Sequence, residues 1–420
     1  MARSLVSHRY WGAPGGGQLV CASAAVALDK MGLTPVLTGT FNFDKAKYLD
    51  WYGIDLTKYD VEVLMSLNVK AFGLWTRLYM WKPAERVLKR ERDVRIMFID
   101  DETYKPLLKY RQSGLRIVEY IHFPLEVVVD PKYKGTGLAY GEDPYIMERY
   151  GKFPMNIYWG IFVKLLPRYL RGNPFESADV VLTNSRWTAE VAKMVYGEAP
   201  AVLNPPIPPN AEIVERPKPF EERRPIVVML GRFSEEKRYH WVVKEVAPRL
   251  IREVPGAKLV IFGGATTRTQ LGYVERVAQM AREAGLRVEV VQDDVGKAGD
   301  SDVYLRLNAP RAEINRVMDS AKAFLHATIN EHWGIAVAEA MARGLPVVVH
   351  KSGGAWTDLA EEGHAGMGYE DAEEAVEGLA KLLGDKDEWG LFSSRALSRV
   401  ADIGFNKFIS SFLEYIKRIT

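Results

Sequence analysis

The sequence contains very little cysteine, no long apolar run and almost no net charge. Cys21 is the single cysteine among 420 residues, which excludes an intrachain disulfide and indicates a reducing compartment. No run of about 18 uncharged apolar residues occurs, so we expect no membrane-spanning helix. The net charge of +2 gives no argument for bulk nucleic-acid binding.

Several familiar motifs are also missing. The first apolar stretch ends at Asp29-Lys30 and does not form a signal-peptide pattern, so we expect a cytoplasmic protein. The loop Gly15–Gly17 does not match G-x-G-x-x-G, so a nicotinamide cofactor is not supported. No convincing D-x-D motif follows a strand, because Asp100-Asp101 and Asp293-Asp294 are adjacent pairs. The missing G-x-G-x-x-G motif argues against a nicotinamide cofactor, and the missing D-x-D motif agrees with independence of metal ions.

The sequence does contain a regular alternation of short apolar runs and helical or polar segments. TPVLTGT, VEVLMSL, VRIMFID and LRIVEYIHFP are of strand type and are separated by polar or helical segments. This alternation predicts an α/β fold with parallel sheets covered on both faces. The length suggests two or three domains. Prolines and mixed charges at 204–224 mark the expected linker between them.

The most informative stretch, residues 326–359, reads HATINEHWGIAVAEAMARGLPVVVHKSGGAWTDL. We expect a helix from Gly334 to Arg343, ended by a glycine, and then a buried strand and a Gly-Gly turn. Unpaired amides at the start of that helix suit a diphosphate. Glu331 and Glu339 could then each accept hydrogen bonds from one sugar of a nucleoside diphosphate sugar. The alternative is that both glutamates are capping and solvated surface residues.

A second motif, GRFSEEKR, follows an apolar strand near residue 231. We expect Ser234 to cap a helix and Arg232 and Lys237 to stand at the corner between strand and helix. Two cations there could neutralise a departing diphosphate, although a solvated helix start would have the same composition. The run KLVIFGG ends a further strand, which places Gly263 near the nucleoside.

In the first half of the chain two features point to a site. The glycine loop that includes Gly16 and Gly17 precedes an apolar helix, where a backbone can closely approach a phosphate or a sugar. His122 ends a strand, and ligands bind at the carboxyl ends of strands in open parallel sheets. Simple flexibility of the loop and a structural histidine are the competing interpretations.

Residues 155–171 combine aromatic and aliphatic side chains with basic ones on a moderately amphipathic helix. This composition suits a peripheral contact with a membrane surface. A core helix of the first domain would show a similar pattern, and the sequence leaves both interpretations open.

Taken together, these motifs resemble the retaining glycosyltransferases of family 4, and the E-x7-E run most resembles the α-1,2-mannosyltransferases of dolichol-linked oligosaccharide assembly. The resemblance rests on GRFSEEKR, LNAP, E-x7-E and HKSGG in the second half, and on shorter marks at 15–17, 119–124 and 184–188 in the first. It implies the glycosyltransferase B architecture of two Rossmann-like domains facing a cleft. We expect an N-terminal, acceptor-binding domain over 1–210, joined by a C-terminal helix at 400–420 that crosses back to it, and a nucleotide-sugar domain over 218–399.

The resemblance also implies roles for individual residues. Arg232 and Lys237 would bind the diphosphate without any metal, Glu339 the ribose, and Glu331 with His122 the transferred sugar. The residues that we expect at the donor are Gly16, Gly17, Arg232, Lys237, Gly263, Asn330, Glu331, Gly334, Ile335 and Glu339. The expected reaction is hexose transfer with retention, with GDP-mannose as donor and a glycan or lipid-linked glycan as acceptor.

Two departures make the acceptor harder to infer than the chemistry. Trp356-Thr357 stands where the family has Pro-Lys. We also expect no counterpart of the first transmembrane anchor that is common in the eukaryotic enzyme. Two other functions remain open. A transferase or synthase of the same fold could use a UDP- or ADP-sugar, and a sensor could bind a nucleotide sugar without turnover.

Overall fold

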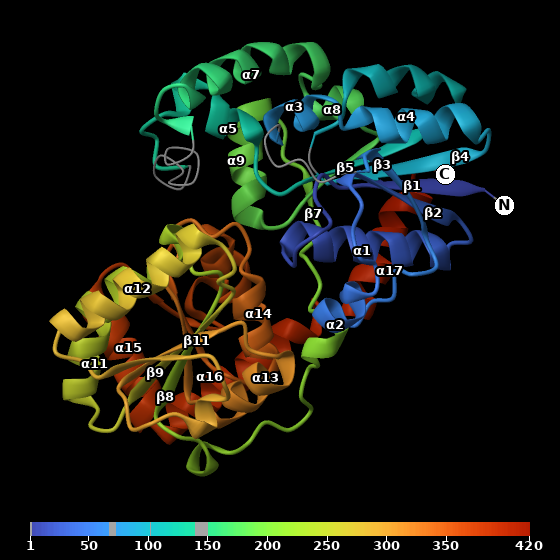
Figure 1. Ribbon diagram of the computed structural model, residues 1–420. Coiled ribbons are helices and arrows are strands. Elements are labelled where there is room, and N and C mark those ends of the chain that lie inside the picture. The colour runs from blue at the N-terminus through green and yellow to red at the C-terminus, as the bar shows by residue number, and fades with distance from the viewer. Residues whose placement is uncertain (1, 67–72, 101, 139–149) are drawn as a thin grey trace. The chain divides into compact units, whose positions relative to one another are not determined.

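The computed structural model describes residues 2–66, 73–100, 102–138 and 150–420. The chain divides into two compact units, Met1–Asn210 with Ile403–Thr420, and Ala211–Asp402. Each unit contains one parallel sheet of seven strands with helices on its two faces (Figure 1). The predicted α/β class and the pair of Rossmann-like units are therefore confirmed.

The first unit has the strand order β3-β2-β1-β4-β5-β6-β7. Its strands are β1 (Arg3–Ser7), β2 (Thr34–Phe41), β3 (Asp60–Met65), β4 (Val94–Ile99), β5 (Arg116–Ile121), β6 (Val180–Thr183) and β7 (Ala201–Val202). All the strands predicted from apolar runs in this half are present and pair in parallel. Apolar runs without alternation suit such strands because both faces of the sheet are covered.

Helices of the first unit cover this sheet on both sides (Figure 1). They are α1 (Gly16–Lys30), α2 (Lys47–Tyr52), α3 (Gly73–Leu78), α4 (Trp81–Arg90), α5 (Leu125–Val129), α7 (Met155–Tyr169), α8 (Pro174–Ser177), α9 (Arg186–Tyr196) and α17 (Phe405–Lys417). The expected return of the C-terminal helix is confirmed, since α17 packs against α1. The Phe412 ring of α17 also meets the edge of Phe98 on β4, with 5.5 Å between centroids.

The second unit has the strand order β10-β11-β9-β8-β12-β13-β14. Its strands are β8 (Ile226–Leu230), β9 (Lys258–Gly263), β10 (Val288–Val291), β11 (Val303–Leu307), β12 (Ala323–His326), β13 (Val347–His350) and β14 (Met367–Tyr369). Its helices are α10 (Tyr239–Trp241), α11 (Ala247–Glu253), α12 (Arg268–Glu283), α13 (Arg311–Ser320), α14 (Ile335–Ala342), α15 (Ala372–Gly384) and α16 (Lys386–Ala401). The strand predicted at LPVVVH is β13, between β12 and β14.

In both units the strand order reverses beside the first strand. β1 lies between β2 and β4, and β8 lies between β9 and β12. Loops that leave the carboxyl ends of neighbouring strands diverge at such a point and leave a crevice where open α/β sheets bind ligands. The loops after β1 and β4, and those after β8 and β12, are therefore the places to look for a site.

Helix α7 matches neither interpretation of residues 155–171 completely. Phe162 and Leu166 are buried in the core of the first unit, as a core helix requires. Ile157 and Ile161 on the same helix are 53% and 44% exposed, which a core helix does not require. Among the residues that the structure describes, no helix is both long and apolar enough to span a membrane.

Candidate functional site

In the second unit an ion pair joins the two loops that meet at the reversal of strand order. Lys237 Nζ, after β8, lies 2.7 Å from Glu331 Oε2, after β12. The same carboxylate oxygen lies 3.0 Å from His326 Nε2, at the end of β12. Lys237 and Glu331 side chains are only 18% and 13% exposed. Two residues that were predicted to bind the donor are thus in contact, together with a histidine that the sequence analysis did not single out.

The charges in this group are set by burial and by one another. Burial, the largest influence, raises the pKa of Glu331, but Lys237 and the hydrogen bond to His326 outweigh it and hold that pKa well below its usual range. Burial lowers the pKa of His326. An ionised Glu331 accepts and never donates, so a neutral His326 must carry its proton on Nε2. Glu331 therefore receives hydrogen bonds from both neighbours.

The Ser352–Gly354 turn braces the loop that carries Glu331. Gly354 N donates to Glu331 O at 2.7 Å, and Asn330 N donates to Ser352 Oγ at 2.7 Å. A Cβ atom on Gly353 would lie 2.3 Å from Glu331 O, so a side chain there would push the loop away. Gly353 of the Gly-Gly motif is thus required by close packing of two backbones.

Gly334 begins helix α14 in the left-handed conformation, at φ 101°. Its carbonyl accepts the amides of Val337 and Ala338. The amides of Ile335 and Ala336 therefore precede the hydrogen-bond ladder, which is the arrangement that favours an anion. The predicted end of the helix is also correct, since α14 is followed by Gly344 at φ 64°.

Glu339, on the buried side of α14, is held by an arginine. Arg311 Nη1 lies 2.8 Å from Glu339 Oε2, and Nη2 lies 3.0 Å from Oε1. This two-point contact fixes the plane of the carboxylate. Each oxygen keeps a second lone pair, so a hydroxyl group could still donate to it.

Arg232 forms an ion pair with Glu236, and none with Glu331, among the residues that the structure describes. Its side chain is 71% exposed, and Glu236 is 3.7 Å away. The prediction that Ser234 caps a helix is wrong in its detail. A 3₁₀ turn, Glu235–Lys237, follows it, and the Ser234 hydroxyl bonds to the Glu236 side chain rather than to a backbone amide. The turn ends at Arg238 in the left-handed conformation, and this aims Lys237 at Glu331.

Gly263 lies at the carboxyl end of β9, where a side chain would collide with its neighbours. A Cβ atom there would lie 2.5 Å from Gly231 O and 2.6 Å from the Phe233 ring. The loop after β11 is joined to the loop after β9, because Asn308 Oδ1 accepts a hydrogen bond from Ala265 N at 3.1 Å. Close packing therefore accounts for this glycine, and its predicted contact with the nucleoside stays a prediction.

In the first unit, the loops that follow β1, β4 and β5 bring two histidines to one carboxylate. His122 Nε2 lies 3.3 Å from Asp100 Oδ2, and His8 Nδ1 lies 2.6 Å from the same oxygen. Gly17, in the first turn of α1 next to Gly16, lies against this group, since a Cβ there would be 2.8 Å from that oxygen. Asp101 falls outside the residues that the structure describes.

Sequence reasoning missed His326, Arg311, His8 and the role of Asp100. His326 is the last residue of β12 and Asp100 directly follows β4, and this position after a buried strand was the available signal. Arg311 is 28 residues from Glu339 in the chain, and no local sequence pattern predicts a pair at that separation.

The sequence comparisons agree with this geometry. Residues 210–396, nearly the whole second unit, match the family profile described as glycosyl transferases group 1. The chain is 24% identical over 453 aligned positions to the human GDP-Man:Man(3)GlcNAc(2)-PP-Dol alpha-1,2-mannosyltransferase, covering 98% of this chain and 86% of the relative.

Solved structures resemble the whole chain in fold. Anabaena Alr3699/HepE, in complex with UDP and glucose, superposes with a TM-score of 0.65 at 16% identity, covering 99% of this chain and 100% of that one. Sucrose-phosphate synthase from Thermosynechococcus elongatus gives a TM-score of 0.65 at 15% identity, covering 99% and 98%. These likenesses establish the glycosyltransferase B fold.

Proposed function

We propose that this glycosyltransferase, whose residues 210–396 match the profile of the glycosyl transferases group 1, moves mannose from GDP-mannose to a hydroxyl group of a glycan, free or linked to a lipid. The proposal includes retention of the anomeric configuration and independence of metal ions. Support for the donor comes from the relative, whose name specifies GDP-mannose and a lipid-linked oligosaccharide.

The observation that carries the proposal is the ion pair between Lys237 and Glu331. It holds an ammonium group at the reversal of strand order, where a nucleotide would bind. Negative charge grows on the diphosphate as its bond to the sugar breaks, and a fixed cation stabilises that charge. Amides at the start of α14 act in the same direction. Arg232 would leave Glu236 to join them.

In the proposed reaction the bond between the anomeric carbon and the diphosphate breaks. A bond from the acceptor oxygen forms on the same face, and the acceptor proton passes to a diphosphate oxygen. Glu331 and, in the first unit, His122 accept hydrogen bonds from hydroxyl groups of the transferred sugar. Glu339, oriented by Arg311, receives the ribose hydroxyls. No side chain acts as a nucleophile in this scheme.

Donor consumption by the purified chain tests the proposal. GDP-mannose, UDP-glucose and UDP-N-acetylglucosamine are supplied in parallel, each with EDTA, and with or without a mannosyl lipid acceptor. We expect consumption of GDP-mannose alone, resistant to EDTA. Preference for a UDP-sugar would overturn the donor assignment. Tight binding of a donor without turnover would replace the transferase with a sensor.

We further propose that α7 lies on an anionic membrane surface during the reaction. Ile157 and Ile161 are exposed four residues apart on one side of α7, and Phe153 is exposed just before the helix begins. The exposed Lys164 and Arg168 follow them along the helix. An apolar strip beside basic residues suits an interface with acidic lipids.

Flotation with vesicles that contain phosphatidylserine tests this contact. The double variant Ile157→Asp with Ile161→Asp should remain unbound while the wild type floats with the vesicles. Leu271→Asp is the matched control, because Leu271 is 44% exposed on α12 in the other unit. Equal flotation of the wild type and the double variant would contradict the proposed contact.

A further inference from the structure

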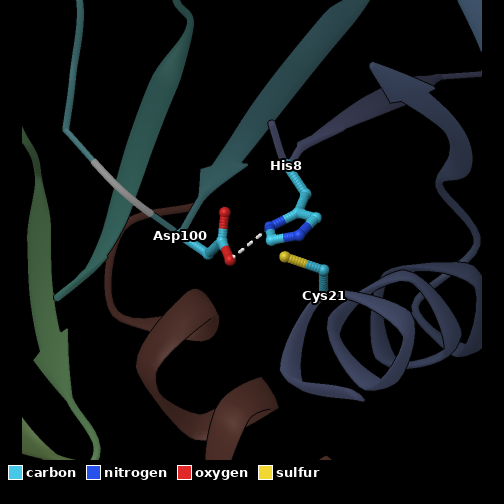
Figure 2. Close-up of side chains that lie close together, drawn as sticks. All are labelled: His8, Cys21 and Asp100. Atoms are coloured by element: carbon cyan, nitrogen blue, oxygen red, sulfur yellow. Dashed lines mark hydrogen bonds and ion pairs between the residues drawn. The ribbon is translucent and has the colours of Figure 1, made fainter. Parts of the chain in front are cut away.

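A buried carboxylate at the end of β4 contacts imidazoles from two neighbouring strands. Asp100 is 1% exposed, and its Oδ2 lies 2.6 Å from His8 Nδ1 after β1. His122 Nε2, after β5, lies 3.3 Å from the same oxygen, which is an ion-pair distance without a formed hydrogen bond. Figure 2 shows the carboxylate of Asp100 and the ring of His8 facing each other, with the Cys21 sulfur beside them. The residues that follow β1 and β5 thus both contact Asp100 Oδ2, which follows β4.

The surrounding backbone is shaped to admit this group. A Cβ atom on Gly17 would lie 2.8 Å from Asp100 Oδ2, 3.0 Å from His8 Cε1 and 3.4 Å from His122 Nε2. Only a glycine in the first turn of α1 leaves room for all three side chains. The His122 backbone is fixed independently, because its carbonyl accepts from Asn184 Nδ2 at 2.9 Å.

Asp100 keeps its charge in spite of its burial. Burial, the largest influence, raises the pKa of Asp100, but His8 and His122 lower it below its usual value. An ionised carboxylate accepts hydrogen bonds only, so each ring nitrogen beside it is the one that carries a proton. For His122 this nitrogen is Nε2, and the second nitrogen, Nδ1, is left with its lone pair when the ring is neutral.

A bound metal ion would require a different geometry. His8, Cys21 and Asp100 offer nitrogen, sulfur and oxygen atoms within 4.8 Å of one another. Bonds of about 2.0–2.1 Å in a tetrahedral zinc site would separate nitrogen and oxygen ligands by roughly 3.3 Å. The 2.6 Å between His8 Nδ1 and Asp100 Oδ2 is shorter than this separation and corresponds to a short hydrogen bond.

We propose that Asp100 is a positioning residue for His122. Its carboxylate keeps the His122 proton on Nε2 and leaves Nδ1 as the nitrogen that accepts a hydrogen bond from a sugar hydroxyl, while His8 holds Asp100 in place. This inference rests on the proposed function for the part that concerns the sugar. The assignment of the proton does not depend on that function.

NMR of the full chain with ¹⁵N-labelled imidazoles tests the assignment directly. The His122 signals are identified by their absence in His122→Gln. Above pH 8 the wild type should show a protonated Nε2 and an unprotonated Nδ1, and Asp100→Asn should show a mixture of tautomers. Cys21→Ala, which changes a neighbour of the same carboxylate, should keep the wild-type signals. Unchanged His122 signals in Asp100→Asn would overturn the proposal.

Kinetics of the same variants separate this proposal from the proposed function. Asp100→Asn should lower kcat by roughly ten- to a hundred-fold through misplacement of the ring, with KM for the donor within about three-fold of the wild type. Cys21→Ala should keep its kcat. Full activity of His122→Gln would overturn the proposed role in transfer even if the tautomer changes as expected. A stoichiometric metal, lost in Asp100→Asn, would overturn the positioning role.

Discussion

Lys237 Nζ and Glu331 Oε2 lie 2.7 Å apart although 94 residues separate them in the chain. The contact exists because β8 and β12 are neighbours in the sheet, so their carboxyl-terminal loops leave from adjacent positions. One loop contributes a cation, and the other contributes a buried carboxylate that fixes it. Our account of donor binding in the second unit depends on this pair.

Replacing Lys237 by alanine should lower kcat/KM by about 10²–10³-fold, because the charge of the departing diphosphate loses its nearest fixed cation. Lys237→Arg should recover part of the loss. Lys244→Ala is the matched control, since Lys244 is 63% exposed in the same unit and should keep wild-type activity. Initial rates with GDP-mannose measure the effect, and a Lys237→Ala enzyme as active as Lys244→Ala would exclude this role.

Replacing Arg311 by methionine should weaken donor binding and destabilise the second unit. Glu339 would keep its buried position and lose both hydrogen bonds to the guanidinium. We expect a cost of about 1–3 kcal/mol, below the value for a fully buried pair because Arg311 is partly exposed. KM for the donor should rise about tenfold.

The control for Arg311 lies on the same helix. Arg316 pairs with Asp294 at the surface, and Arg316→Met should change the unfolding free energy by less than about 0.5 kcal/mol. Urea unfolding and donor titration measure the two effects. Identical donor affinity in Arg311→Met and Arg316→Met would contradict the orienting role of Arg311.

In the first unit, Arg171→Met should cause a large loss of stability. Arg171 and Glu119 are almost wholly buried and in contact, and Glu126 also bonds to the guanidinium. Removing one partner leaves a buried carboxylate uncompensated, at a cost of about 3–5 kcal/mol. Arg168→Met, on exposed α7, is the control. Hydrogen exchange in β5 should accelerate in Arg171→Met alone, and equal exchange in both variants would contradict the prediction.

Acidification should loosen the loop that carries Glu331, because protonation of His350 removes a hydrogen bond that supports this loop. Burial and the nearby Arg238 lower the pKa of His350 to about 4, and its Nδ1 accepts from Ser352, which in turn receives the Asn330 amide. The unfolded chain binds this proton at about pH 6.5, so stability is complete above that pH and falls as the pH decreases towards 4. We expect a loss of roughly 1–2 kcal/mol, given the partial exposure of the ring.

Thermal unfolding at pH 7.5, 6 and 5 measures this dependence. His350→Gln, whose side chain does not titrate, should show a smaller decrease in Tm over the same range than the wild type. His364→Gln is a control in another part of the unit. Parallel Tm curves for the wild type and His350→Gln would exclude His350 as the source.

The sequence was sufficient to predict features that are encoded locally. Parallel strands followed from continuous apolar runs, and the end of α14 followed from Gly344, because residues next to one another in the chain determine each of these features. The Gly353–Gly354 turn was recognised, but its reason, contact with the Glu331 backbone, required coordinates. Arg232 is a different case, since its motif predicts a contact with the diphosphate while its side chain is 71% exposed.

Pairs formed across a sheet could not be read from spacing. Asp100 meets His8 across 92 residues because β4 lies beside β1, and the order of strands is not written in any single strand. Arg311 on α13 reaches Glu339 on α14 across 28 residues, with β12 between the two helices in the chain. Such contacts depend on topology, so sequence reasoning named one partner of each pair at best.

The most direct test of the account is the anomeric configuration of the product. GDP-mannose labelled with ¹³C at the anomeric carbon is incubated with the chain, EDTA and a mannosyl acceptor, and the product is examined by NMR. The account predicts a single new α-mannosyl linkage, formed by the wild type and lost in Lys237→Ala. A β linkage, or no transfer of mannose from an enzyme that transfers glucose from UDP-glucose, would contradict it.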